Sequence, residues 1–224
     1  MKSCLCLVTD RRRLGEAVGA KPDEWVDALR EQVGAAAKAG IDYVQVRESD
    51  LEGRDLANLV RSLLEMTRKT ATKVLVNDRI DVALATHAHG VHLKERGILP
   101  GLVRRIAPAG FVIGCSIHTT AGIAARKTAD FLVAGTVLPT ASKRAPDYLD
   151  IDGLRKIVEA AAGQSVLGIG GLDARSVPLL TSSGAAGLAA IGAFIPAGGE
   201  SVTDFVQKRV HDLRFALDQT PRRT

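Results

Sequence analysis

Eight short apolar runs, separated by stretches with helical periodicity or by polar turns, limit the fold more than any other feature of the sequence. The runs occupy residues 4–8, 43–46, 73–76, 90–93, 111–115, 131–135, 165–169 and 187–191. Strands that alternate with helices must be joined by crossover connections and therefore pair in parallel. Eight such units in 224 residues predict an α/β protein, a single-domain (β/α)8 TIM barrel. A doubly wound open sheet is the alternative, although no GxGxxG motif follows the first run.

The helical periodicity is clearest after the first run, where Trp25, Leu29 and Val33 recur at intervals of four. We expect Asp23 to cap the start of this helix and Gly40 to end it. Similar patterns fill the other connections, so each strand is expected to be followed by a helix that buries one face.

The alternation of strands and helices predicts a single barrel domain that contains nearly all of the chain. We place this domain at residues 1–215 and expect residues 216–224 to form a frayed tail. Residues 11–21, with their run of arginines and two glycines, are typical of a long loop above the first strand.

The composition argues against several classes of function. The net charge of +5 comes from Lys and Arg spread along the chain, with no basic block among stacking aromatics, which disfavours nucleic-acid binding. No stretch approaches the ~18 apolar residues of a membrane span, and the first apolar run is too short for a signal peptide. The three cysteines have neither zinc nor disulfide spacing, so we expect thiols in a cytoplasmic protein. A basic excess does suit phosphorylated small molecules.

Polar side chains lie at or just after the ends of the apolar runs, where a barrel gathers its reacting groups at the carboxyl ends of the strands. They are Gln45, Arg47, Glu48, Asn77, Asp78, His92, Lys94, Glu95, Ser116 and His118. Arg47 is the least easily explained as structural, because a charge at the end of a buried strand needs a partner or a ligand.

Two further strand ends have the composition of a phosphate site. Hydroxyls and a cation crowd behind the sixth run, at Thr140, Ser142 and Lys143. Glycines follow the seventh and eighth runs, at Gly170, Gly171 and Gly192. Loops after these strands commonly bind phosphate through backbone N–H groups, and glycine lets the backbone approach the anion. The same glycines would also suit a tight turn.

The order and spacing of several short motifs resemble the thiamine phosphate synthase and thiazole tautomerase superfamily of (β/α)8 barrels. The motifs are "LVTD", "VQVRE", "VNDRIDVALATHAHGVHL", "GCSIHT", "ADFLVAGTVLPTASK", "GIGGL" and "GAAGLAAIGAF", and they cover most of the chain. The resemblance implies a synthase that couples 4-amino-2-methyl-5-hydroxymethylpyrimidine diphosphate to thiazole phosphate and releases diphosphate. The implied partners are these small molecules and, as is common in the family, a second copy of the chain.

The resemblance also implies roles for individual residues. Gln45 and Arg47 would contact the pyrimidine and its diphosphate, and Asn77 and Asp78 the pyrimidine and Mg²⁺. Ser116 would hold the diphosphate. The remaining contacts to the phosphorylated substrates would come from Thr140, Ser142, Lys143, Gly170, Gly171 and Gly192. Our candidate catalytic residues are Arg47, Ser116, His118 and Lys143.

Two departures from the family pattern leave the chemistry open. Ser49 stands where synthases usually carry a lysine, and the usual second magnesium aspartate is missing from the segment after "GVHL". Asp78 would then hold Mg²⁺ with the substrate, with Glu95 as a further candidate ligand. Alternatively, the chain is a metal-independent tautomerase of the thiazole phosphate carboxylate, with His118 as base, or a non-catalytic barrel that binds a phosphorylated heterocycle.

Overall fold

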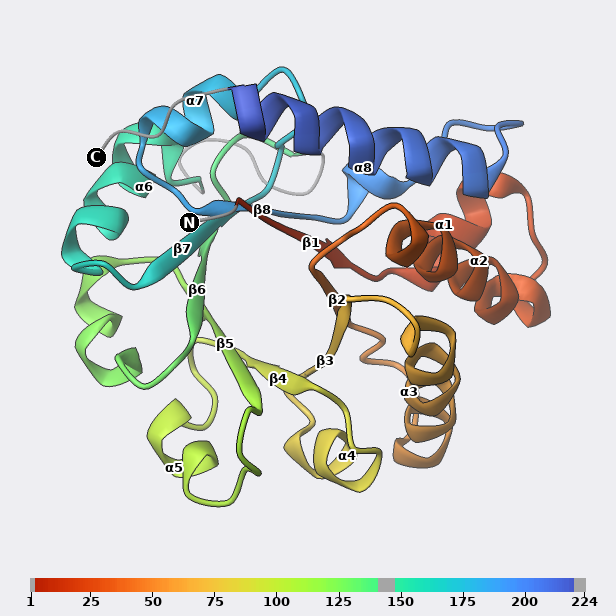
Figure 1. Cartoon of the computed structure of the whole chain (residues 1–224), viewed down its shortest axis with the longest axis horizontal. Helices are drawn as coiled ribbons and strands as arrows, with labels where there is room; N and C mark the ends of the chain where they lie inside the picture. The colour runs from red at the N-terminus through yellow and green to blue at the C-terminus, as the bar shows by residue number, and fades with distance from the viewer. Residues whose placement is uncertain (1–2, 141–147, 220–224) are drawn as a thin grey trace. The chain divides into compact units, whose positions relative to one another are not determined.

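The strands form where the apolar runs predict them. In the computed structural model, which describes residues 3–140 and 148–219, eight strands form a closed parallel barrel in chain order (Figure 1). They are β1 (Cys4–Val8), β2 (Tyr43–Val46), β3 (Lys73–Asn77), β4 (Gly90–Leu93), β5 (Val112–Ile117), β6 (Phe131–Gly135), β7 (Ser165–Ile169) and β8 (Gly187–Ala190). The prediction of a (β/α)8 barrel is therefore confirmed.

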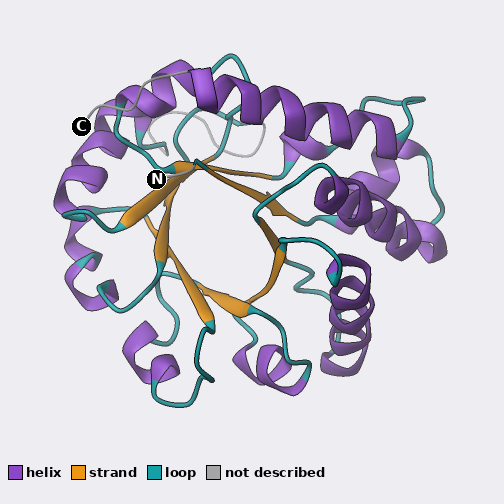
Figure 2. Cartoon of the chain, in the orientation of Figure 1, coloured by secondary structure: helices purple, strands orange, loops and turns teal. Residues whose placement is uncertain are grey.

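Helices occupy the connections between the strands (Figure 2). The α-helices are α1 (Arg11–Val18), α2 (Trp25–Lys38), α3 (Gly53–Thr67), α4 (Ile80–Ala85), α5 (Pro100–Arg104), α6 (Asp150–Ala160), α7 (Val177–Ser182) and α8 (Val202–Gln219). Shorter 3-10 helices are η1 (Pro22–Glu24), η2 (Thr120–Gly122), η3 (Ala124–Arg126) and η4 (Gly192–Phe194). The connection between β5 and β6 thus holds two 3-10 turns where the sequence predicts an α-helix.

The register of the first three strands aligns their carboxyl ends. Val8 on β1 pairs with Gln45 on β2, and Gln45 pairs with Leu75 on β3, all in parallel. Val74, Leu75 and Val76 are fully buried, as consecutive apolar residues are when both faces of a parallel strand are covered. The residues that follow these strands therefore leave the sheet at one level.

The described chain divides into two compact units. One is built around His92–Ala190, and the other around Cys6–Val91 with Ile191–Asp212. In the second unit α1 packs against α2 and α2 against α3, and the Gln32 amide donates to the Phe194 carbonyl oxygen over 2.7 Å. The bounds of the barrel domain at residues 1–215 remain a prediction.

The prediction of a long loop at residues 11–21 is wrong, because most of this segment forms the helix α1. The Asp10 carboxylate accepts from the backbone N–H of Arg13 and caps the helix, and Gly19 ends it at φ 71°. Leu14 is fully buried beneath the helix. A Cβ on Gly15 would lie 1.9 Å from the Trp25 ring, so this glycine lets α2 approach α1. The run of arginines made this segment look like a polar loop, although it forms a short amphipathic helix with a polar N-cap.

Two predicted helix ends also need correction. Asp23 lies inside η1, and the residue before α2 is Glu24, so Asp23 does not cap the longer helix. Gly40 does follow the end of α2, in a left-handed conformation at φ 87°. Helix α8 continues to Gln219, so part of the segment expected to be a frayed tail is helical. Within the described residues, no helix has the length and apolar character needed to cross a membrane.

Candidate active site

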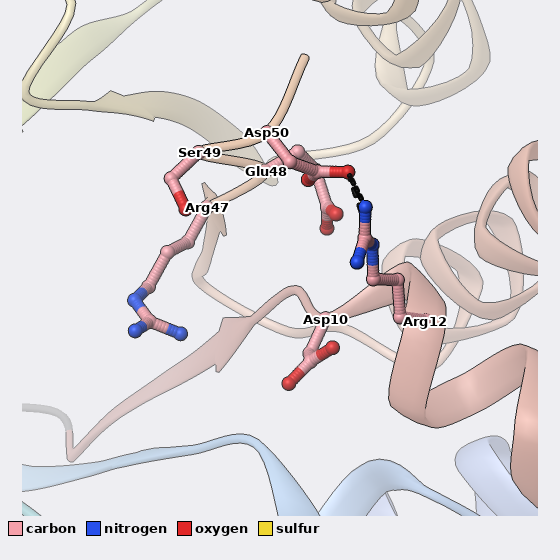
Figure 3. Close-up of a pocket in the computed structure, with 6 residues that line it drawn as sticks. All are labelled: Asp10, Arg12, Arg47, Glu48, Ser49 and Asp50. Atoms are coloured by element: carbon pink, nitrogen blue, oxygen red, sulfur yellow. Dashed lines mark hydrogen bonds and ion pairs between the residues drawn. The ribbon is translucent and has the colours of Figure 1, made fainter.

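A polar pocket lies where the chain leaves β1 and β2. Six side chains line it, those of Asp10, Arg12, Arg47, Glu48, Ser49 and Asp50 (Figure 3). The parallel pairing of Val8 with Gln45 brings the two segments together, and the Thr9 N–H donates to the Gln45 carbonyl oxygen over 3.0 Å. The motifs "LVTD" and "VQVRE" therefore meet in one site.

Glu48 is the buried centre of this pocket, with 5% of its surface exposed. Its carboxylate accepts from the Thr9 hydroxyl over 2.6 Å and from the Arg11 guanidinium over 2.9 Å. Burial raises the pKa of Glu48, while the hydrogen bonds from Thr9 and Arg11 oppose that rise. With the Arg11 backbone N–H, which donates over 3.2 Å, three donors thus hold a carboxylate that is costly to bury alone.

Asp50 forms the outer part of the same cluster. Its carboxylate pairs with the Arg11 guanidinium over 2.6 Å and with that of Arg12 over 2.8 Å. The hydrogen bond from Arg11 holds the pKa of Asp50 well below its usual range. Two of the three consecutive arginines are therefore bound to carboxylates.

Arg47, the predicted diphosphate contact, differs from these arginines. Its backbone N–H donates to the Thr9 hydroxyl oxygen over 2.9 Å, which fixes the main chain. Its side chain is exposed and extends away from the Arg12–Asp50 pair in Figure 3. In the part of the chain that the structure describes, its guanidinium makes no hydrogen bond or ion pair. It is available to an anionic ligand.

Gln45 and Asn77, predicted to contact the pyrimidine, lie side by side. The Gln45 amide, on a residue that is 5% exposed, donates to the Asn77 side-chain oxygen over 2.9 Å. Asp78 follows in a left-handed conformation at φ 62°, which Asp tolerates better than most residues. Arg79 pairs with Asp81 through two hydrogen bonds of 2.9 and 2.6 Å at the surface.

The donor set fits Mg²⁺ only as an ion shared with a substrate. Among the described residues, no group of three or more His, Cys, Asp or Glu side chains is arranged to hold a metal. Mg²⁺ is commonly bound by one or two carboxylates together with substrate phosphates and water. Asp78 can supply one such carboxylate. Glu95, the further candidate, is instead bonded to His118.

In the other compact unit, one histidine pair lies on β4 and β5, and a second pair lies just after these strands. The Ser116 hydroxyl lies 2.9 Å from Nε2 of His92, which is 2% exposed. His118 Nδ1 lies 2.6 Å from the Glu95 carboxylate, and the His118 backbone N–H donates to the same group over 3.0 Å. Burial acts to raise the pKa of Glu95, but the hydrogen bonds from His118 and the nearby charge of Arg126 outweigh it, and the pKa is lowered.

The glycines after β7 are held in place by contacts with residues 136–139. Gly170 and Gly171 have φ of 100° and 68°. The Leu138 N–H donates to the Gly170 carbonyl oxygen over 3.1 Å. A Cβ on Gly170 would lie 3.0 Å from the Thr136 Cα, and one on Gly171 would lie 2.7 Å from the Pro139 carbonyl oxygen. Both glycines thus have positive φ and lie close to the segment that leads to Thr140, and their role in binding phosphate stays a prediction.

The remaining predicted residues are placed unequally. Thr140 is half-buried, whereas Ser142 and Lys143 lie outside the described residues. Gly192 is exposed at the start of η4, after β8, and the Arg13 guanidinium lies against it.

Comparison with known proteins decides the family. The family model described as thiamine monophosphate synthase matches residues 6–194. The chain belongs to this family. The resemblance carried by the short motifs is thereby confirmed.

Relatives of this family match over almost the whole chain. The thiamine-phosphate synthase of Pyrococcus abyssi is 33% identical over 217 residues, covering 96% of this chain and 95% of the relative. That of Roseiflexus sp. is 36% identical over 195 residues, covering 85% and 78%. The solved structure of thiamine phosphate pyrophosphorylase from Pyrococcus furiosus is 30% identical, with a TM-score of 0.77 and 96% of each chain covered.

Two groups of residues in this chain were not predicted from the sequence. The first is Arg11 and Asp50, the partners of Glu48, and the second is Arg13, which lies in α1 and not in a loop. The sequence did contain one signal for both groups. Asp10 lies three residues before Arg13, which is the spacing of a side chain that caps a helix, and a helix that begins there sets the directions of the arginine side chains.

Proposed function

We propose that this protein is a thiamine-phosphate synthase, a transferase that joins a pyrimidine diphosphate to a thiazole phosphate. The observation that carries the proposal is the family match over residues 6–194, together with relatives of that name that match nearly end to end. The protein would act on these phosphorylated heterocycles rather than on nucleic acid or a membrane. A homodimer and a cytoplasmic location remain part of the proposal.

The reaction is an ionisation followed by capture. The bond between the pyrimidine methylene carbon and the diphosphate oxygen breaks, and diphosphate leaves with the electron pair. The thiazole nitrogen then donates its lone pair to the carbon. Charge that develops on the leaving oxygens must be neutralised, and Mg²⁺, which Asp78 would hold with the substrate, would supply part of that neutralisation.

The proposal gives this chain's residues distinct parts in that reaction. The Arg47 guanidinium, which makes no ion pair with any residue that the structure describes, would bind the diphosphate, and the Gln45–Asn77 pair would orient the pyrimidine. Asp78 would hold Mg²⁺ with the substrate. Ser116, held by His92, would donate to diphosphate oxygens. The thiazole phosphate would be bound by Gly170, Gly171, Gly192, Thr140, Ser142 and Lys143.

The synthase reaction requires no protein nucleophile or base, so it does not need His118 as a base. The His118–Glu95 pair has the form of a carboxylate-oriented base, the feature that suits the tautomerase alternative. The names of the relatives favour the synthase. In the synthase His118 would orient a ligand.

One assay separates the three hypotheses. The protein is incubated with the pyrimidine diphosphate, the thiazole phosphate and Mg²⁺, and thiamine phosphate is measured by mass spectrometry, with Asp78→Asn and chelator controls. We expect product that falls on chelation and in Asp78→Asn. No product at high protein concentration would overturn the proposal. Interconversion of thiazole phosphate carboxylate isomers in that case would identify the tautomerase, and binding without either reaction a non-catalytic barrel.

A further inference from the structure

The three consecutive arginines at the start of α1 are not equivalent. Arg11 is bound to Glu48 and Asp50, and Arg12 to Asp50. Arg13 is exposed, and only its backbone N–H is engaged, as the donor to the Asp10 cap. Across residues 3–140 and 148–219, no carboxylate pairs with its guanidinium.

The Arg13 guanidinium has a defined position despite this lack of an ion pair. A Cβ built on Gly192 would lie 3.1 Å from one terminal nitrogen of Arg13 and 3.5 Å from both the other terminal nitrogen and the central carbon. All three heavy atoms of the guanidinium's outer edge therefore crowd the place where a side chain of residue 192 would stand. Both residues belong to the same compact unit.

Glycine at position 192 permits this approach, because a Cβ contact of 3.1 Å is shorter than van der Waals packing allows without a shift. The result, within the described residues, is an exposed planar cation with no ion-pair partner beside the exposed backbone of Gly192, at the start of η4. A guanidinium offers five N–H donors in a fork that matches the oxygens of a phosphate, and such charge-assisted contacts are about twice as strong as neutral ones. This is the chemistry of a phosphate monoester contact.

We propose that Arg13 is a substrate-binding residue that recognises the phosphate of the thiazole substrate beside Gly192. This inference rests on the proposed function for the identity of the ligand. It adds to that function a cationic side chain of α1. This side chain makes the site select the phosphorylated thiazole over the unphosphorylated one.

Calorimetric titration of the full chain tests the inference without requiring turnover. The ligands are thiazole phosphate, the corresponding thiazole alcohol, pyrimidine diphosphate and inorganic phosphate. The variants are Arg13→Ala and Arg13→Lys. Arg61→Ala is the matched control, because it removes one surface arginine from α3 whose guanidinium donates to Asn58. Circular-dichroism melts verify that each variant is folded.

Loss of one charge-assisted contact predicts that Arg13→Ala weakens thiazole phosphate binding about 10- to 100-fold. Binding of the alcohol should be unchanged, and Arg13→Lys should recover part of the loss, because lysine keeps the charge but not the fork. In turnover, the KM for thiazole phosphate should rise while kcat changes little. Equal affinities of Arg13→Ala and Arg61→Ala for thiazole phosphate would overturn the inference, as would a loss confined to pyrimidine diphosphate.

The same titration separates this inference from the proposed function. If the wild-type protein makes no thiamine phosphate yet binds thiazole phosphate or inorganic phosphate in an Arg13-dependent way, the synthase proposal fails and the phosphate contact stands. If the wild-type protein makes thiamine phosphate and Arg13→Ala leaves its phosphate affinity unchanged, the synthase stands and the contact fails. A folded wild-type protein that binds no phosphate ligand overturns both.

Discussion

The imidazole Nδ1 of His118 lies 2.6 Å from Oε2 of Glu95, whose other oxygen accepts from the His118 backbone N–H. The lowered pKa of Glu95 keeps this carboxylate ionised near neutral pH. An ionised carboxylate only accepts hydrogen bonds, so Nδ1 carries the proton and Nε2 of a neutral His118 is left as an acceptor. The pair is thus suited either to orient a ligand or to accept a proton.

His118→Gln distinguishes these two roles. Ionisation of a diphosphate needs no protein base, so we expect thiamine phosphate formation to fall less than about tenfold. A general base typically contributes about 10²- to 10⁴-fold, so a larger loss in kcat, with a pH profile that flattens, would contradict the orienting role. The measurement is kcat across pH for the wild type and the variant.

Glu95→Gln tests the structural contribution of the same pair. A carboxyl group whose pKa is lowered by folding stabilises the protein above its unfolded pKa, and that stability is lost as the pH falls through the folded value. We therefore expect a loss of about 1 kcal/mol at pH 7 that disappears as the pH falls through the lowered pKa of Glu95, measured by denaturant unfolding. Glu65→Gln, in an exposed pair with Arg68, is the control and should change little at either pH. A deficit in Glu95→Gln that persists in acid would refute the assignment.

Arg11 and Arg12 contact the same carboxylate but are buried differently, which predicts unequal effects on stability. The Arg11 side chain is 10% exposed and neutralises the buried Glu48, whereas that of Arg12 is 59% exposed. Arg11→Ala should cost about 3 kcal/mol at pH 7, because it leaves a buried carboxylate unpaired. Arg12→Ala should cost less than about 1 kcal/mol.

The pH dependence of Arg11→Ala has a definite sign. Without Arg11, the pKa of Glu48, already raised by burial, rises further. The variant's deficit should therefore be largest at neutral pH and shrink as the pH falls toward the unfolded value of about 4.3, where Glu48 is protonated in both states. Unfolding curves of Arg11→Ala and Arg11→Ala/Glu48→Gln from pH 7 to 5 test this, since the second substitution should remove the pH dependence. An equal slope in both would argue against it.

The strands were predictable because their burial leaves a local record. Parallel strands covered on both faces need consecutive apolar residues, and the run at 165–169 matches β7 residue for residue. Polar residues at the ends of these runs likewise marked Gln45 and Arg47. Both inferences use neighbours in sequence only.

Pairings between distant segments left no such record. Nothing in the sequence links Arg13 to Gly192, because the two residues lie far apart in the chain and meet only in the folded compact unit that contains both. The position of Glu95 after β4 made it a candidate metal ligand, but in the structure its carboxylate is hydrogen-bonded to His118. Local composition locates polar groups, but their partners depend on the packing of the completed fold.

Ser49 predicts a gain of function by substitution. It lines the pocket beside Arg47, at the position where synthases of this family usually carry a lysine. Ser49→Lys adds a second cation for the diphosphate, so we expect the KM for the pyrimidine diphosphate to fall by up to about tenfold. Ser49→Ala should leave the KM within about twofold of the wild type, since it adds no charge. Identical KM values for Ser49→Lys and Ser49→Ala would show that the pocket does not bind diphosphate.

Gly192→Val should remove ligand binding and keep the fold. Its Cβ would meet the flexible end of Arg13 at 3.1 Å, which can move aside, and the branched side chain would then occupy the proposed phosphate position. Gly187→Ala provides the contrast, because its Cβ would lie 1.9 Å from the Cys4 carbonyl oxygen, where only backbone can yield. That substitution should cost about 1–3 kcal/mol or more of stability. Thermal melts and thiazole phosphate titrations of both variants separate the effects: Gly192→Val should melt near the wild-type temperature without binding. A Gly192→Val protein that binds thiazole phosphate with wild-type affinity would exclude this glycine, and the Arg13 contact beside it, from the phosphate site.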